Sequence, residues 1–238
     1  MTSDFPYPLT EVSPPEALAV LERLSRTPGQ SGLIVGTGES VELLAEAFVP
    51  LPGDRQAGVP AQPGPTEILK SAASLRFPGD YEVFLRTLAA DDGELEPEEG
   101  TWPDAGFETL GVEDAIVGLA SAGGAGTDKL FVATLPTNDP AEAPAYLRYG
   151  GWNAYPPADH HVAALRSWQR RYGARLVAMT SDIVVLSVER PVTDPDEALT
   201  LARELYRYCP DSVDQGTGTV QILAAGLIGA TAWGFWWD

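Results

Sequence analysis

The chain has 238 residues, 44% of them hydrophobic and 21% charged, which is enough length and apolar content to build a core and excludes the disordered class. Its formal charge is −19, and a field of that sign repels nucleic acid and anionic membrane surfaces, so we expect neither as a partner. The single cysteine, Cys209, excludes a disulfide within the chain.

The negative charge is concentrated toward the N-terminus. Residues 1–128 hold 6 Lys and Arg against 22 Asp and Glu, a formal charge of −16, whereas residues 129–238 hold 9 against 12, a charge of −3. Such a region steers basic partners toward the protein or only keeps it soluble, and the charge by itself does not choose between the two. The first residues lack the basic and apolar segments of a secretory signal, which together with the lone cysteine predicts a cytoplasmic protein.

Residues 1–128 are predicted to form an acidic N-terminal α/β region. Leucines at helical spacing predict a helix over 14–26, and an apolar run followed by a glycine turn predicts a strand and a helix over 32–48. Five prolines among glycines mark residues 50–65 as a linker, and helical segments follow over 66–90.

Residues 129–238 are predicted to form a second domain with clearer boundaries. In chain order we expect a strand, two helices, a two-stranded hairpin, two helices and a terminal strand, over residues 129–137, 140–147, 156–173, 174–191, 195–209, 220–229 and 230–238. Asp139, Asp194 and Thr219 are the expected N-caps, and Gly173 is the expected stop of the longest helix. This order predicts a mixed sheet with helices packed on it, hence an α+β fold.

Aromatic residues crowd the terminal strand. In a strand, Trp233, Phe235 and Trp237 face one side, while Gly234 and Trp236 face the other. Apolar groups on both sides favour a strand inside the sheet, covered on both faces, over an exposed aromatic surface. The uncharged stretch 220–237 is near the length of a membrane span, but its glycines and the absence of flanking Lys or Arg favour a helix, a turn and a strand, so we expect no membrane anchor.

Three sequence features resemble chemical sites but are predicted to have structural roles. The stretch Val35–Ser40, "VGTGES", resembles a dinucleotide-binding turn, but Val41 stands where the third glycine belongs, so we expect no cofactor. His160 and His161 are adjacent and point about 100° apart on a helix, so we expect packed or capping histidines and no metal site. Cys209 ends a helix and is followed by two aspartates, which raises the pKa of its thiol and predicts a structural cysteine.

The loop "RYGGWNAYPP", residues 148–157, combines two glycines with Trp152, Asn153 and Tyr155. Loops of this composition often line binding sites, and an aromatic plug for the core explains the same residues equally well. If the fold brings the loop beside Cys209 and Asp211, the two motifs form one pocket.

The motifs "GGWNAYPP", "RYGARLV", "YCPDSVDQG" and "FWWD" together resemble a bacterial family named domain of unknown function 4253. The resemblance covers roughly residues 129–238, and the Cys209-Pro210-Asp211 step and the final Trp236-Trp237-Asp238 match the family's marks. Many members carry a cysteine where this chain has Tyr155, which argues against a paired-thiol or metal role here. The resemblance implies a domain and no activity.

The sequence therefore supports two functional hypotheses. The leading one is a non-enzymatic protein-binding module, an inhibitor or immunity-type partner of a basic protein, because the chain is acidic and carries no recognised catalytic signature. The alternative is an enzyme that acts on a small molecule near Trp152, Asn153, Cys209 and Asp211. The candidate binding residues are Trp152, Asn153, Tyr155, Cys209, Asp211, Gln215 and Trp236.

Overall fold

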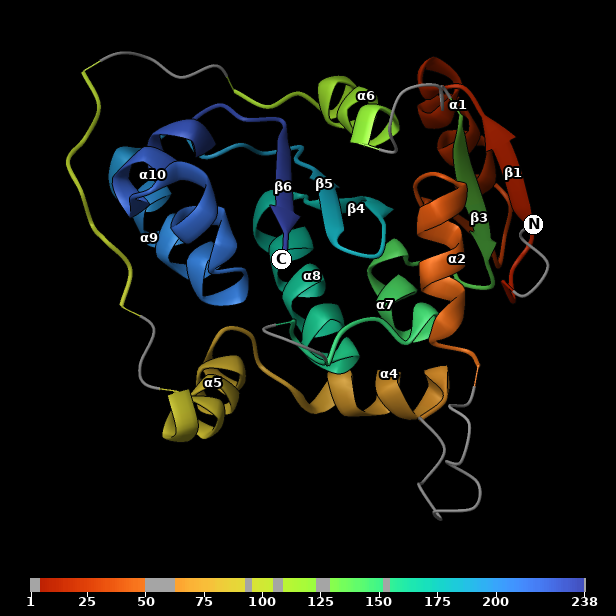
Figure 1. Cartoon of the computed structure of the whole chain (residues 1–238), viewed down its shortest axis with the longest axis horizontal. Coiled ribbons are helices and arrows are strands. Elements are labelled where there is room, and N and C mark those ends of the chain that lie inside the picture. Colours follow the sequence, from red (N-terminus) through yellow and green to blue (C-terminus); the bar gives the residue numbers. More distant parts are fainter. Residues whose placement is uncertain are drawn as a thin grey trace.

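A computed structural model describes residues 5–49, 63–92, 96–104, 109–122, 129–151 and 155–237. Six strands form one sheet with helices packed against it (Figure 1). The strands are β1 Leu9–Val12, β2 Ser31–Ile34, β3 Leu130–Leu135, β4 Arg175–Met179, β5 Ile183–Ser187 and β6 Ala232–Trp236. The helices are α1 Pro14–Ser25, α2 Gly38–Glu46, α4 Pro65–Ser74, α5 Gly79–Asp92, α6 Val112–Ala122, η1 Pro140–Glu142, α7 Ala143–Leu147, α8 Ala158–Tyr172, α9 Pro195–Tyr208, η2 Ser212–Thr217 and α10 Val220–Leu227.

The sheet has the strand order β1-β3-β2-β4-β5-β6. β2 and β4 run parallel, and the other neighbouring pairs run antiparallel. The mixed sheet confirms the predicted α+β class. In the C-terminal half the described order is a strand, short and long helices, the β4–β5 hairpin, α9, α10 and β6, as the sequence predicts, with the short η2 added between α9 and α10.

The helix boundaries follow from local chemistry. The side chains of Asp139, Asp194 and Thr219 accept hydrogen bonds from backbone N–H groups in the first turns of η1, α9 and α10, at 3.1, 2.9 and 3.3 Å. Gly173 ends α8 at φ +63°, a conformation that other residues adopt only with strain. The predicted caps and stop are thus present.

The N-terminal region contributes strands to the same sheet as the C-terminal region. β1 and α6 were not expected from the sequence, and β2 lies between β3 and β4. One sheet therefore contains strands from both predicted regions, residues 1–128 and residues 129–238. Of the predicted linker at 50–65, residues 50–62 lie outside the described residues.

The sheet has a covered face on each side. Leu33, Leu186 and Phe235 belong to the larger cluster of buried residues, together with side chains of α2, α7, α8, α9 and α10. Ile34 and Val185, their neighbours along the strands, belong to a smaller cluster with α1 and α6. The alternation of strand side chains decides which cluster each residue joins.

The position of β6 corrects one expectation. β6 lies in the sheet, as predicted, but it forms an edge and pairs only with β5 among the described strands. Trp233, Phe235 and Trp237 are buried, whereas Gly234 is exposed and Trp236 is 37% exposed. The strand is thus fully covered on one face only, because α6 contacts both β5 and β6 on the other face and still leaves Gly234 and Trp236 exposed. No helix in the described ranges is long and apolar enough to cross a bilayer.

Candidate functional site

The end of β6 gathers the predicted binding residues that the structure describes. The ring of Tyr155 stacks on Trp237 with ring centroids 4.7 Å apart. The Tyr155 hydroxyl lies 3.4 Å from the backbone carbonyls of Ser181 and Trp237, to which it donates. Tyr155 is therefore a buried plug at this corner of the sheet. Trp152 and Asn153 lie outside the described residues.

Cys209 is held inside the protein at the end of α9. Its thiol is buried and donates to the carbonyl oxygen of Trp236 at 2.9 Å. Burial raises the pKa of the Cys209 thiol to about 12, and the nearby Asp211 carboxylate also acts to raise it. A raised pKa disfavours the thiolate at neutral pH, which agrees with the structural role that the sequence predicts for Cys209.

We expect Cys209 in the native protein to react with iodoacetamide at pH 7 far more slowly than after unfolding in guanidinium chloride. The buried thiol with its raised pKa supplies neither access nor thiolate. Mass spectrometry of the alkylated chain over time measures both rates. Rapid modification of the folded protein would reopen an enzymatic role for this residue.

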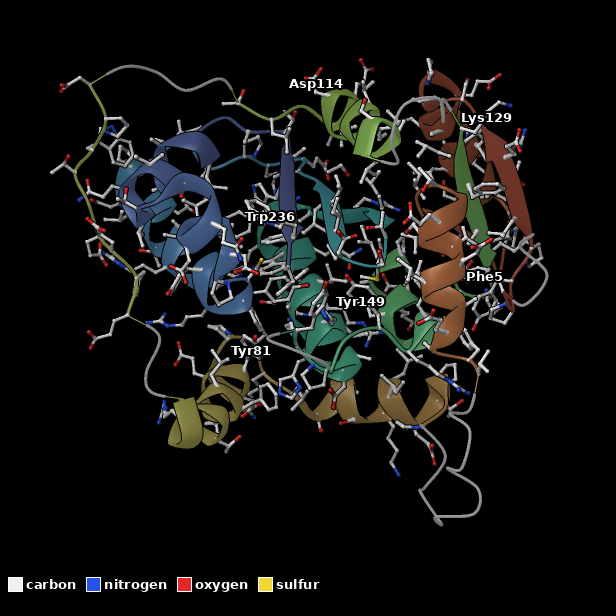
Figure 2. The ribbon with its side chains drawn as sticks, in the orientation of Figure 1. Phe5, Tyr81, Asp114, Lys129, Tyr149 and Trp236 are labelled. Atoms are coloured by element: carbon white, nitrogen blue, oxygen red, sulfur yellow. The ribbon has the colours of Figure 1, made fainter. Side chains whose placement is uncertain are left out.

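Asp211, Gln215 and Trp236 form the outer part of the same corner. The Gln215 amide, inside η2, donates to the carboxylate of Asp211, the residue just before η2, at 3.1 Å. The ring of Trp236 packs against Gly216, where an added Cβ would stand only 2.7 Å from the ring. Gly216 therefore makes room for Trp236, which Figure 2 labels, and the Trp236 side chain stays partly exposed.

Buried polar rings lie behind Trp237, and among them the sequence predicted a packed position only for His161. His161 is fully buried, and its Nδ1 lies 2.6 Å from the Tyr208 hydroxyl. Burial lowers the pKa of His161 to about 3, so the ring is uncharged at neutral pH. Tyr149 Oη, His161 Nε2 and Trp237 Nε1 are buried without a hydrogen-bond partner in the described part of the chain, which is uncommon in a protein core.

An open cavity of about 210 Å³ lies where the parallel strands β2 and β4 end. One wall is the Val35–Ser40 loop and the first turns of α2, and the other is the turn between β4 and β5. The lining residues are Gly36, Thr37, Glu39, Ser40, Leu43, Leu119, Thr180, Ser181, Asp182 and Ile183. The carboxyl ends of parallel strands are a common place for ligands in sheets of this kind.

The cavity walls are joined by a short polar contact. The backbone N–H of Ser181 donates to the Ser40 hydroxyl at 3.2 Å. At Gly36, whose φ is +84°, an added Cβ would lie 2.9 Å from both Ser40 and Thr180. Gly36 is thus required for the two walls to approach, which gives the "VGTGES" motif a structural role here.

The charge of the cavity argues against phosphate. Glu39 and Asp182 are among the lining residues, and none of them is basic. The pyrophosphate of a dinucleotide would meet two carboxylates instead of a compensating cation. In the described ranges no group of three or more His, Cys, Asp or Glu residues is arranged to hold a metal ion.

One residue of the cavity lining lies beside β6. Ile183, which lines the cavity, is paired across the ladder with Trp236, so both side chains lie on the same face of the sheet. Leu43, on the α2 side of the cavity, is 46% exposed. We call Leu43, Ile183 and Trp236, with the carboxylates of Glu39 and Asp182, the Trp236 surface.

Residues 131–238 match the model of the family described as "Domain of unknown function (DUF4253)". The C-terminal part of the chain therefore contains this domain, in agreement with the motifs in its sequence. Comparison with curated proteins and with solved structures found no match. The Trp236 surface combines residues of this domain with Glu39 and Leu43 from outside it.

Proposed function

We propose that the protein is a non-enzymatic binding module that docks a basic protein, as an inhibitor or immunity-type partner does. The observation that carries the proposal is the partly exposed Trp236 beside Ile183, next to a cavity with two carboxylates. A cytoplasmic location remains part of the proposal.

The apolar residues of the Trp236 surface are suited to form the centre of an interface. Tryptophan is enriched among the residues that dominate binding energy, because it buries a large area with few rotatable bonds. Trp236 is held in place on its inner side by Gly216 and by the strand backbone, which the Cys209 thiol contacts. Its ring therefore loses little conformational freedom when a partner covers it.

The charge of the protein supplies the rest of the recognition. The carboxylates of Glu39 and Asp182 lie beside the apolar residues, and the whole chain carries −19. A basic partner is drawn toward such a surface, and its attraction is screened over about 8 Å at physiological ionic strength. An acidic or neutral partner would gain nothing from this field.

We expect the immobilised full-length chain to retain basic proteins from an extract of its own host, and Trp236→Ala to lose them. The matched control is Trp102→Ala, because Trp102 is 40% exposed and is not part of the Trp236 surface. Quantitative mass spectrometry of the retained proteins, eluted at low and at high salt, compares the three chains. Native mass spectrometry of the protein purified from that host then gives the stoichiometry.

Two results would count against the proposal. Equal retention by the Trp236→Ala and Trp102→Ala chains would show that the surface does not bind the partner. Retention that is unchanged between low and high salt would remove the electrostatic part of the argument. The enzymatic alternative has less support, because the thiol of Cys209 is un-ionised and enclosed.

A further inference from the structure

The size of the cavity separates two kinds of occupant. Sites for cofactors and drug-sized ligands usually measure about 300–1,000 Å³. The cavity between β2 and β4 measures about 210 Å³ and is open to the surface. Such a volume is suited to one long side chain that enters from a docked protein.

Thr37 supplies a polar group on the α2 wall of this cavity. It stands at the N-cap of α2, yet its side chain makes no cap hydrogen bond. Thr37 is only 7% exposed and lines the cavity, and its hydroxyl has no hydrogen bond within the described part of the chain. The Thr37 hydroxyl is not one of the fully buried polar atoms that lack a partner, so it is open to the cavity and can donate to or accept from a bound polar group.

The charges around the cavity determine whether it favours a cation or an anion. The first turn of α2 presents a partial positive charge of about half a unit to the cavity, whereas Glu39 and Asp182 present two full negative charges. The carboxylates therefore dominate, and a cation is favoured over an anion. The Asp182 carboxylate is oriented by the hydroxyls of Thr180 and Ser181, which donate to its Oδ1, each at 2.9 Å.

The walls are also suited to the stem of a basic side chain. Leu43, Leu119 and Ile183 supply apolar surface beside the carboxylates. Arginine and lysine cover apolar surface with their methylene groups while their charged ends meet acceptors. A guanidinium has five N–H donors in a planar fork, so it can reach acceptors on both walls, whereas an ammonium acts as a compact point charge.

We propose that this cavity receives an arginine side chain of the basic partner, with the guanidinium between the α2 wall, Thr37 and Glu39, and the β4–β5 wall, Asp182. The inference rests on the proposed function and names the group that the partner inserts. Trp236 and Ile183 then contact the residues that flank this arginine, since Ile183 belongs to both places.

The test uses a small probe in place of the unknown partner. N-acetyl-arginine methylamide is titrated at low salt into the full-length ¹⁵N-labelled chain, beside its citrulline analogue, which is uncharged, and its lysine analogue. We expect the amide signals of Gly36–Ser40 and Thr180–Ile183 to shift with the arginine probe, and the citrulline probe to bind about tenfold more weakly, a difference of about 1.4 kcal/mol. Equal binding of arginine and citrulline, or of arginine and lysine, would overturn the assignment.

Variants locate the probe in the cavity. We expect Asp182→Asn to weaken arginine binding about fivefold or more, and Thr37→Val, which keeps the shape and removes the hydroxyl, to weaken it about threefold. The control is Asp196→Asn, the same loss of charge at an exposed position of α9. An equal effect of Asp182→Asn and Asp196→Asn would mean that only the general field acts, and would contradict the site.

The two proposals fail in different ways. If partner capture depends on Trp236 but the arginine probe does not shift the cavity signals, the binding function stands and the arginine site is wrong. If the probe binds as expected and no captured protein depends on Trp236, the cation site stands and the protein-binding function is wrong.

Discussion

A chain that ends at Gly229, without β6, is expected to lose cooperative folding altogether. β6 contributes Trp233 and Phe235, and the chain then adds Trp237, and all three side chains are buried. Truncation of one buried aromatic residue to alanine costs about 3–5 kcal/mol, and the whole stability of a protein is about 5–15 kcal/mol. Loss of all three, together with the ladder to β5, exceeds what the rest of the fold can supply.

Two point variants in the same strand show how much stability a single side chain of β6 contributes. Phe235→Ala removes a ring that is 1% exposed and should lower the free energy of unfolding by about 3–5 kcal/mol. Trp236→Ala, at the more exposed position next to it, should change it by about 1 kcal/mol or less. Thermal and denaturant unfolding, followed by near-ultraviolet circular dichroism, compares the four chains. A truncated chain with an unchanged transition would show that β6 is dispensable.

Glu204→Leu is expected to cause the largest loss of stability among changes of charged residues in α9. Glu204 is 8% exposed and accepts from Trp168 Nε1 at 2.5 Å and from Arg171 Nη1 at 3.0 Å. The substitution leaves the buried Trp168 N–H without its acceptor, which costs about 1–3 kcal/mol, whereas the Arg171 side chain is 37% exposed and can be hydrated. For a chain of this size the melting temperature falls by about 2–4 °C per kcal/mol, as differential scanning calorimetry can measure.

Two further substitutions show whether the loss arises from the buried contact. Glu204→Gln should be milder than Glu204→Leu, since an amide oxygen still accepts from Trp168. Glu99→Gln removes a carboxylate from the exposed pair with Arg203, at 2.8 Å, and should change the melting temperature little. Equal losses at Glu99 and Glu204 would mean that general charge, and not the Trp168 contact, sets the stability.

The C-terminal half of the fold could be predicted from its sequence because local signals mark each element. Asp139, Asp194 and Thr219 cap helices in the structure, and Gly173 ends α8. These signals depend on a few neighbouring residues, so they survive in the sequence whatever the tertiary structure is.

Strand partners could not be predicted in the same way. β1 is four residues long, and it is a strand because Leu9–Val12 pair with β3, more than a hundred residues later. The edge position of β6 likewise depends on the order of all six strands. Non-local pairing of this kind leaves little trace in the residues of a short strand.

The residues of the candidate site could be located only with the structure. Tyr155 stacks on Trp237 and the Cys209 thiol donates to the Trp236 carbonyl, so both contact the end of β6, and their role in binding stays a prediction. The sequence drew attention to the "VGTGES" loop for its resemblance to a nucleotide-binding turn. It could not show that Glu39 faces the same cavity as Asp182, because that proximity arises only when β2 and β4 lie side by side.

The insertion of β2 between β3 and β4 has a consequence for the DUF4253 domain itself. Residues 131–238 contain β4, β5, β6 and nearly all of β3, but the strand that joins β3 to β4 comes from residues 31–34. Neighbouring strands lie about 4.8 Å apart, so without β2 the domain has a slot about 9.6 Å wide, lined by backbone N–H and C=O groups. Residues 131–238 therefore do not form a continuous sheet by themselves, and β2, from the preceding residues, supplies the strand between β3 and β4.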